Sequence, residues 1–380
     1  MNSRIDEFTA AINGVLLTGV LLCSHVTSAQ TAPLVTLPAA IRNFSEEFSD
    51  ITSLREIKGG RLLITDRKDS RIIALNTATG VVTVVGRQGQ GPNEYPTIMP
   101  VWPIGGDSSV MIFIGGSRWL MLDGANIVST LSSKTPAVAA AKSIVRGTND
   151  IGDVFASSAI GIGGSYGDST PLLRINRATG KIDTVTKLKG VAVKRSTEPG
   201  NPEGSGYFQT SVPALQVTEQ SIPFPDGWIA ITRLDPYRVD WRSPTGVWTR
   251  GAPMPFTNIP MTDAEKQTVM ERSARKAGKA AEPFSSLRGW PEIVPPYAVP
   301  VTLFAAPDGR AIIGRLPSIE YPKTRYDIVS RSGKLEAQLE LSANEKLAGF
   351  GAGKTVYVVT TDDNGIQRLS KRNWLLVMQR

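Results

Sequence analysis

Six glycine-containing turns, each followed by a short apolar run rich in β-branched residues, recur along the chain. The turns end at Gly60, Gly106, Gly152, Gly227, Gly309 and Gly353. These glycines lie 46, 46, 75, 82 and 44 residues apart, which indicates one unit of about 45 residues with two intervals lengthened by insertions. Repetition of a single short unit is typical of radial or stacked repeat proteins, so it constrains the fold more than any individual motif does.

The first copy of the unit, residues 51–86, shows what the unit is. It contains four strand-like runs, ITSLREI, GRLLITD, SRIIALN and GVVTVVG, which are separated by turn-forming segments. Four such runs predict one antiparallel sheet that is apolar on both faces, and packing copies of the sheet around an axis buries those faces. The sequence therefore predicts an all-β fold, a six-bladed β-propeller of four-stranded antiparallel blades.

The last blade shows only three strands. We expect the N-terminal segment Leu34–Leu37 to supply the fourth, so that both chain ends close the ring in one sheet.

A helical insertion is predicted over 260–296, between blades four and five. Thr262 to Glu265 forms a capping box, and four apolar residues then share one face of a helix expected over 262–281. The opposite face is basic, with Lys266, Arg272, Arg275, Lys276 and Lys279. This face is expected to be solvated, the alternatives being a lid over the central funnel or a docking site for an acidic partner.

One part of the chain resembles a known family. In GRLLITDRKDSRIIALNTATG a strand ends in Asp66 and the next opens with Arg71-Ile72, which is similar to an NHL-type repeat. The following GRQGQGPNEY resembles the G-x-G-x-G-P-G-E-F signature that joins blades in bacterial secreted six-bladed propellers, with Asn93 and Tyr95 as replacements. The resemblance implies a six-bladed propeller and leaves the function open, because such propellers include lyases, lactonases, receptors and scaffolds.

The N-terminus predicts the compartment. Residues 10–26 are mostly apolar, and Thr27-Ser28-Ala29 is a small-residue cleavage site, so residues 1–29 are expected to be a signal peptide. A single propeller domain over 30–380, secreted or periplasmic and without a transmembrane anchor, would remain. Lipidation at Cys23 is an alternative to simple cleavage.

Cleavage after Ala29 would remove the only histidine and the only cysteine, His25 and Cys23. The mature chain would then lack disulfides, a thiolate nucleophile, an imidazole base and His or Cys metal ligands. The G-x-S-x-G match at Gly163–Gly167 is therefore interpreted as a glycine-rich loop. The phosphate-loop match at Ala348–Thr355 runs directly into a strand and is interpreted as a hairpin turn.

The net charge of +8 is spread along the chain. It favours weak attraction to anionic surfaces, whereas nucleic-acid binding is not expected because no recognition module or basic-aromatic stripe occurs. We expect a monomer, and no cofactor.

A small-molecule site would lie in the central funnel, reached by the loops that join second to third strands and consecutive blades. These loops supply the candidate ligand-binding residues Asp66, Arg87, Gln88, Gln90, Glu94, Tyr95, Arg118, Tyr237, Arg315, Glu320 and Tyr321. For Arg87 and Glu94 the favoured interpretation is structural, an ion pair that ties neighbouring blades together.

Two classes of function remain open. The first is a ligand-binding or protein-interaction module that takes a protein, glycan or small molecule through its funnel or rim. The second is a His-free enzyme of the lactonase, hydrolase or lyase type that uses carboxylate, Tyr and Arg side chains, with an oxygen-ligated Ca²⁺ as an option. Convergence of Asp66, Glu94 and Glu320 near the axis would favour the enzyme.

Overall fold

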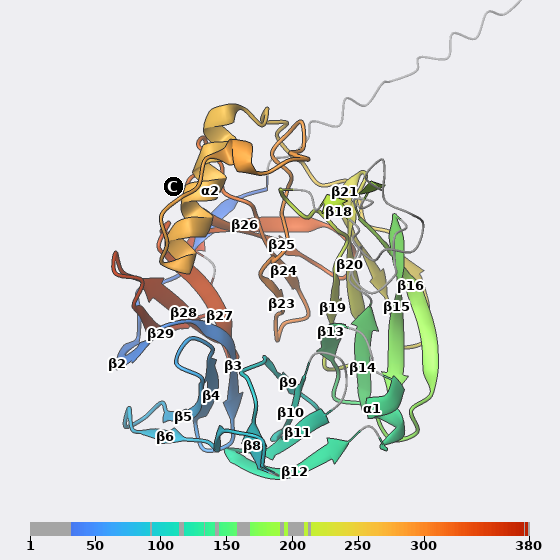
Figure 1. Ribbon diagram of the computed structural model, residues 1–380, viewed down its shortest axis with the longest axis vertical. Coiled ribbons are helices and arrows are strands. Elements are labelled where there is room, and N and C mark those ends of the chain that lie inside the picture. The colour runs from blue at the N-terminus through green and yellow to red at the C-terminus, as the bar shows by residue number, and fades with distance from the viewer. Residues whose placement is uncertain are drawn as a thin grey trace, which may run out of the picture. The chain divides into compact units, whose positions relative to one another are not determined.

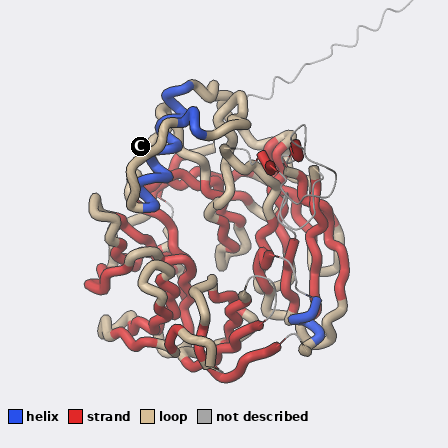
Figure 2. Tube along the Cα trace, viewed as in Figure 1, coloured by secondary structure: helices blue, strands red, loops and turns tan. Residues whose placement is uncertain are grey.

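The computed structural model describes residues 32–378 apart from 92, 114–117, 133, 141–143, 158–167, 191–193, 197–208, 212–213 and 376. The predicted signal peptide, with Cys23 and His25, and the Gly163–Gly167 motif lie outside the described residues. The structure confirms the all-β prediction, since strands far outnumber helices among the described residues (Figure 2).

Six four-stranded antiparallel sheets form the propeller. The first three are made of β3 (Ile51–Ile57), β4 (Arg61–Asp66), β5 (Arg71–Asn76) and β6 (Val82–Val84); β9 (Val101–Pro103), β10 (Ser108–Ile112), β11 (Arg118–Asp123) and β12 (Asn126–Ser132); and β13 (Ile144–Thr148), β14 (Asp153–Ser157), β15 (Ser169–Asn176) and β16 (Ile182–Lys189). Figure 1 shows the sheets around a common centre, with the first strand of each sheet innermost.

The other three sheets follow the same plan. They are made of β19 (Ser221–Pro223), β20 (Ile229–Leu234), β21 (Tyr237–Arg242) and β22 (Trp248–Thr249); β23 (Leu303–Ala305), β24 (Ala311–Gly314), β25 (Thr324–Val329) and β26 (Leu335–Leu341); and β27 (Glu345–Gly351), β28 (Thr355–Thr361), β29 (Gln367–Asn373) and β2 (Arg42–Phe48). The turn between β27 and β28 confirms that the phosphate-loop match is a hairpin turn.

The N-terminal segment closes the ring, but with a different strand from the one predicted. The fourth strand of the sixth sheet is β2, which pairs antiparallel with β29. Residues Leu34–Thr36 form β1 instead, which pairs in parallel with β26 and carries the short C-terminal strand β30 (Val377–Met378) at the edge of the fifth sheet. The prediction was wrong because β2 contributes Phe44 and Phe48 to a buried cluster, and two aromatic rings bury more apolar area than the short LVTL run.

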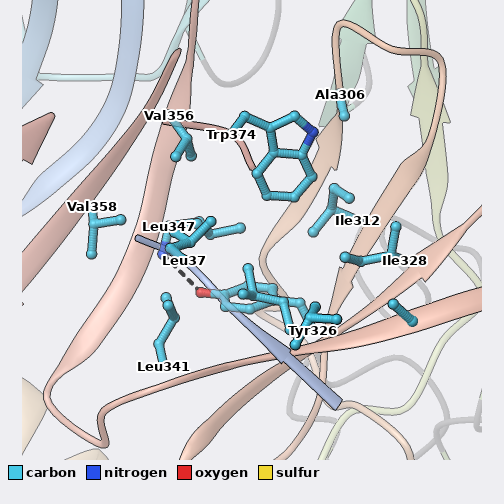
Figure 3. Packing of buried hydrophobic residues seen from close by; sticks show 13 residues of the cluster. Leu37, Ala306, Ile312, Tyr326, Ile328, Leu341, Leu347, Val356, Val358 and Trp374 are labelled. Atoms are coloured by element: carbon cyan, nitrogen blue, oxygen red, sulfur yellow. Dashed lines mark hydrogen bonds between the residues drawn. The ribbon is translucent and has the colours of Figure 1, made fainter. Parts of the chain in front are cut away.

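Each pair of neighbouring sheets shares one buried apolar cluster, and six such clusters complete the ring. Figure 3 shows the cluster between the fifth and sixth sheets, in which the Tyr326 hydroxyl accepts a hydrogen bond from the Leu347 amide at 2.9 Å. Among the described residues, the interface between the third and fourth sheets has the smallest of the six clusters, built around Phe155, Leu188 and Ile231.

The insertion between the fourth and fifth sheets contains the predicted helix. Helix α2 (Asp263–Ala277) begins after the N-cap Thr262 and ends where Gly278 takes a left-handed conformation at φ 68°, four residues before the predicted end at 281. A 3-10 turn, η1 (Phe284–Ser286), follows it.

Part of the basic face of α2 is bound to the propeller. Arg272 donates to the backbone oxygens of Pro317 and Ser318, and the Ile319 amide donates to Glu265. Helix α2 is thereby tied to the loop between the second and third strands of the fifth sheet.

The remaining elements lie in connections between strands. They are the short helix α1 (Pro136–Ala140) and two strand pairs, β7 (Arg87–Gln88) with β8 (Glu94–Tyr95), and β17 (Lys194–Ser196) with β18 (Gln209–Ser211). Within the described part of the chain, no helix is both long and apolar enough to cross a bilayer.

Candidate functional site

The loops that join second to third strands, and those that join consecutive sheets, lie on one face of the propeller, here called the upper face. Five of the predicted residues lie in the first inter-sheet link, 87–95, and their described contacts are with groups of the link itself and of its immediate neighbours. Glu94 accepts hydrogen bonds from Arg87 and from the Gly91 amide, and these interactions hold the pKa of Glu94 below its ordinary value. Gln88 donates to the backbone oxygen of Pro96.

The same link is fixed to the second sheet. Arg118 donates to the backbone oxygens of Gln90 and Glu94 and lies over the ring of Phe113, and Tyr95 is buried in the cluster between the first two sheets. The Arg87–Glu94 ion pair lies within this link, and the bonds that join the link to the second sheet come from Arg118 instead.

The Asp66 carboxylate is likewise bonded to groups of the protein itself. This carboxylate is fully buried and accepts hydrogen bonds from the backbone amides of Ser49 and Asp50, at 3.1 and 2.8 Å, and from Arg71 at 3.4 Å. Burial raises the pKa of Asp66. Asp66 therefore joins the first sheet to the connection that enters it, and its oxygens face protein groups.

Tyr237 and Arg315 meet at a carboxylate that the sequence analysis did not single out. Asp327, on β25, accepts from the Tyr237 hydroxyl at 2.7 Å and from Arg315 at 3.1 Å on one oxygen, and from Gln338 at 2.8 Å on the other. Arg315 also lies over the rings of Tyr237 and Phe256. The available signal was a lone carboxylate just before the apolar pair Ile328-Val329 in the strand-like run TRYDIV, since a buried charge needs partners.

Tyr321 and Glu320 lie in the loop between β24 and β25. Tyr321 stacks under the guanidinium of Arg325, with 4.4 Å between the guanidinium carbon and the ring centroid, while Glu320 is exposed. Arg325 in turn pairs with Glu340 on β26.

Because of Glu340, the free energy of unfolding is expected to depend on pH. Burial alone would raise the pKa of the Glu340 carboxyl, but hydrogen bonds from Lys323 and Arg325 outweigh it and hold the pKa below the ordinary value of 4.5. A carboxyl whose pKa is lowered by folding stabilises the fold above the unfolded value, and this contribution is lost as the pH falls through the folded value. We therefore expect Glu340→Gln to reduce the urea-derived free energy of unfolding more at pH 7 than at about pH 3. An equal loss at both pH values would contradict this assignment.

The structure does not bring the three predicted carboxylates together. Asp66 bonds to the connection that enters the first sheet, Glu94 bonds within the first link, and Glu320 lies in the loop between β24 and β25. In the part of the chain that the structure describes, no group of three or more His, Cys, Asp or Glu could hold a metal ion.

A residue missed by the sequence analysis occupies the inner end of the third sheet. Val145 pairs with Ala156 and Gly147 with Phe155, so Arg146 is the extra residue of a β-bulge on the innermost strand β13. Bulges redirect side chains and are frequent beside functional sites. The innermost strands of the first and sixth sheets carry similar bulges, but the extra residues there are Thr52 and Ala348.

Arg146 reaches from the third sheet to the fourth and is held by neutral groups only. Its Nε donates to Ser157 Oγ at 2.7 Å and its Nη1 to Gln220 Oε1 at 3.4 Å. Burial lowers the pKa of Arg146, and among the described residues no carboxylate pairs with it or acts on its pKa. The Gln220 amide is itself fixed, because it donates to the backbone oxygen and the hydroxyl of Thr218.

Comparisons with known proteins give limited information about relatives. No known family profile matches the chain, and a search of curated proteins finds no match. Solved structures that resemble it include a calcium-binding protein, regucalcin, from Agrobacterium tumefaciens, with 11% identity and a TM-score of 0.45 over 92% of this chain and 97% of that one.

Two further solved structures resemble the chain. One is a Bacteroides fragilis protein described as exported, with 8% identity and a TM-score of 0.48 over 91% of this chain and 100% of the other. The second is virginiamycin B lyase from Staphylococcus aureus, with 13% identity and a TM-score of 0.39 over 88% of this chain and 87% of the other. The functional inference therefore rests on the residues of this chain.

Proposed function

We propose that this chain is an exported, non-catalytic β-propeller that binds an anionic ligand at Arg146. The single observation that carries the proposal is a half-buried guanidinium whose described partners, Ser157 and Gln220, are both neutral. Removing a charge from water costs several kcal/mol unless an opposite charge compensates it. An anionic oxygen from a ligand would supply the compensation that the described protein groups do not.

The geometry favours a carboxylate or phosphate group. A guanidinium presents donors in a planar fork that matches two oxygens of such a group. Nε and Nη1 of Arg146 have acceptors, whereas Nη2 makes no hydrogen bond within the described residues. The bond to Gln220 is long at 3.4 Å, so an incoming oxygen could replace it at little cost.

The placement of the predicted carboxylates favours binding over catalysis. An enzyme of the alternative type would need Asp66, Glu94 and Glu320 to act on one ligand, and these residues have separate surroundings. The proposal includes export because residues 1–29 have the pattern of a signal peptide. N-terminal sequencing of the protein from its native compartment tests this part of the proposal. A mature N-terminus at Gln30 is expected, whereas retention of Met1 would contradict export by cleavage.

Thermal unfolding tests the ligand proposal, with inorganic phosphate and acetate as probes. At a concentration one hundred times its Kd, a ligand adds about 2.7 kcal/mol to the free energy of unfolding. Phosphate also stabilises proteins non-specifically, so the informative quantity is the difference between variants at equal salt. We expect Arg146→Gln to lose the specific part of the increase in Tm that the wild type shows.

Lys354→Gln is the matched control, since it removes one positive charge from the exposed turn between β27 and β28 in the sixth sheet. It should keep the wild-type response. An equal response of the wild type and Arg146→Gln to both anions would overturn the proposal.

A further inference from the structure

A groove of about 340 Å³ separates the outer parts of the third and fourth sheets. Thr186 on β16 lines one side, and the other side is formed by β20, β21, β22 and the residue that follows, Arg250. The volume is near the lower end of the range for small-molecule sites, which is roughly 300–1,000 Å³. The groove lies at the interface with the smallest apolar cluster, so polar groups replace apolar packing there.

Among the described lining residues the one carboxylate, Asp240, is already saturated. Asp240 Oδ1 accepts from Arg238 Nε at 2.9 Å and from the Gly251 amide at 3.2 Å, and Oδ2 accepts from Arg233 Nε at 3.0 Å and Arg238 Nη2 at 3.2 Å. Burial alone would raise the pKa of Asp240, but the hydrogen bonds from Arg238 and Arg233 outweigh it and lower the pKa. Four donors occupy the four lone-pair positions of the carboxylate, so it has no free acceptor site for a ligand.

Donors in the groove remain without acceptors. Arg250 is exposed and, among the described residues, has neither an ion pair nor a side-chain hydrogen bond. Arg238 pairs with Asp240 through Nε and Nη2, and within the described residues its Nη1 and the Thr249 hydroxyl make no hydrogen bond. Arg233, in contrast, is fully engaged by Asp240, Glu219 and the Lys187 backbone oxygen. The lining therefore offers an anion the unpaired guanidinium of Arg250 and the Nη1 group of Arg238, whose Nε and Nη2 are bonded to Asp240.

An aromatic surface lies beside these donors. Trp248 lines the groove with 41% of its surface exposed, although a side chain of this size is normally well covered. An exposed indole provides a flat apolar face for a ring, and its N–H can donate a hydrogen bond. A ligand that uses both features combines a ring with an anionic group.

We propose that this groove is a second binding site, one that takes an acidic saccharide residue of the uronic acid type. The ring lies on Trp248, and the carboxylate pairs with Arg250 and Arg238 Nη1. Ring hydroxyls provide acceptors for Thr249 and for the indole N–H. The site is independent of Arg146, which lies on the innermost strand of the third sheet, whereas the groove lies among the outer strands.

Isothermal titration calorimetry with glucuronate and glucose tests this site. The titrations use the Arg146→Gln variant, so that a carboxylate bound at Arg146 cannot be mistaken for one in the groove. We expect glucuronate to bind at least about tenfold more tightly than glucose, because a charge-assisted hydrogen bond contributes about 1.5–3 kcal/mol. Acetate, which has no ring, should bind more weakly than glucuronate.

Two further substitutions are made in that variant. Arg250→Gln and Trp248→Ala should each weaken glucuronate binding by about tenfold or more. Neither residue forms an ion pair within the described fold, and both are exposed, so the variants are expected to fold. Val247→Ala, a change at an exposed neighbour outside the groove lining, is the control and should bind as its parent does.

The outcomes separate the two proposals. Glucuronate binding that is no tighter than glucose binding, or that persists unchanged in Arg250→Gln, would overturn the groove site and leave the Arg146 site unaffected. Glucuronate binding that requires Trp248 and Arg250 would support the groove site whether or not Arg146 binds phosphate.

Discussion

Replacing Asp327 by Ala is expected to reduce the free energy of unfolding by about 3–5 kcal/mol, because removing one partner of a buried ion pair leaves the other charge uncompensated. Asp327 is fully buried and accepts hydrogen bonds from Arg315, Tyr237 and Gln338. Tyr237 comes from the fourth sheet and Asp327 from the fifth, so the substitution also removes a polar tie between neighbouring sheets. Urea unfolding at pH 7 measures the effect.

The control for this substitution is Asp363→Ala, which removes a carboxylate from an exposed turn. Its effect should lie within about 0.5 kcal/mol, as is usual for surface sites. Asp327→Asn should fall between the two, since the amide keeps one acceptor oxygen but loses the charge. A loss below about 1 kcal/mol in Asp327→Ala would show that the network does not hold the two sheets together.

Phe48→Ala is expected to cost about 3–5 kcal/mol, the usual range for a buried Phe. The Phe48 ring is 1% exposed and lies in the cluster between the sixth and first sheets, which Phe44 also joins. Phe48 is on β2, the N-terminal strand that completes the last sheet, so truncating it weakens ring closure as well as local packing. Urea unfolding gives the free energy.

Val84→Ala provides the comparison, because Val84 is an apolar strand residue that is 61% exposed. It should change stability by less than about 0.5 kcal/mol. If Phe48→Ala were as mild, the N-terminal strand would not be required to close the ring, and the arrangement of the sixth sheet would be contradicted.

The repeat could be predicted from the sequence because local geometry fixes it. The six glycines that end the turns all have positive φ, a conformation that other residues rarely adopt. Apolar runs after these turns became second strands, since burial on both faces leaves a continuous apolar signal. These signals lie within short stretches of sequence. They can be recognised without knowing which strands pair with one another.

The assignment of the closing strand failed because β2 has a weak pattern. RNFSEEF buries Phe44 and Phe48 but exposes or half-exposes its other residues, so it looks polar in sequence. Its identity as a strand depends on β29, whose paired residues are more than 300 positions away. Long-range pairing of this kind leaves little local signal.

The contacts of the candidate site could not be predicted from the sequence for a related reason. Polar residues in loops were identified by type, but the sequence does not show which polar groups satisfy one another. The hydrogen bond between Tyr237 and Asp327 joins residues 90 positions apart. Arg146 gave no signal because a bulge is a property of strand register, and Arg146 became notable only once its described partners proved to be neutral.

The most direct test of the account is calorimetric titration of inorganic phosphate into the wild-type protein and into Arg146→Gln, side by side in the same low-salt buffer. The account predicts saturable binding to the wild type, weakened by at least about tenfold in the variant because a charge-assisted pair is lost. Equal heats and equal affinities for the two proteins would contradict the assignment of Arg146 as the anion-binding residue.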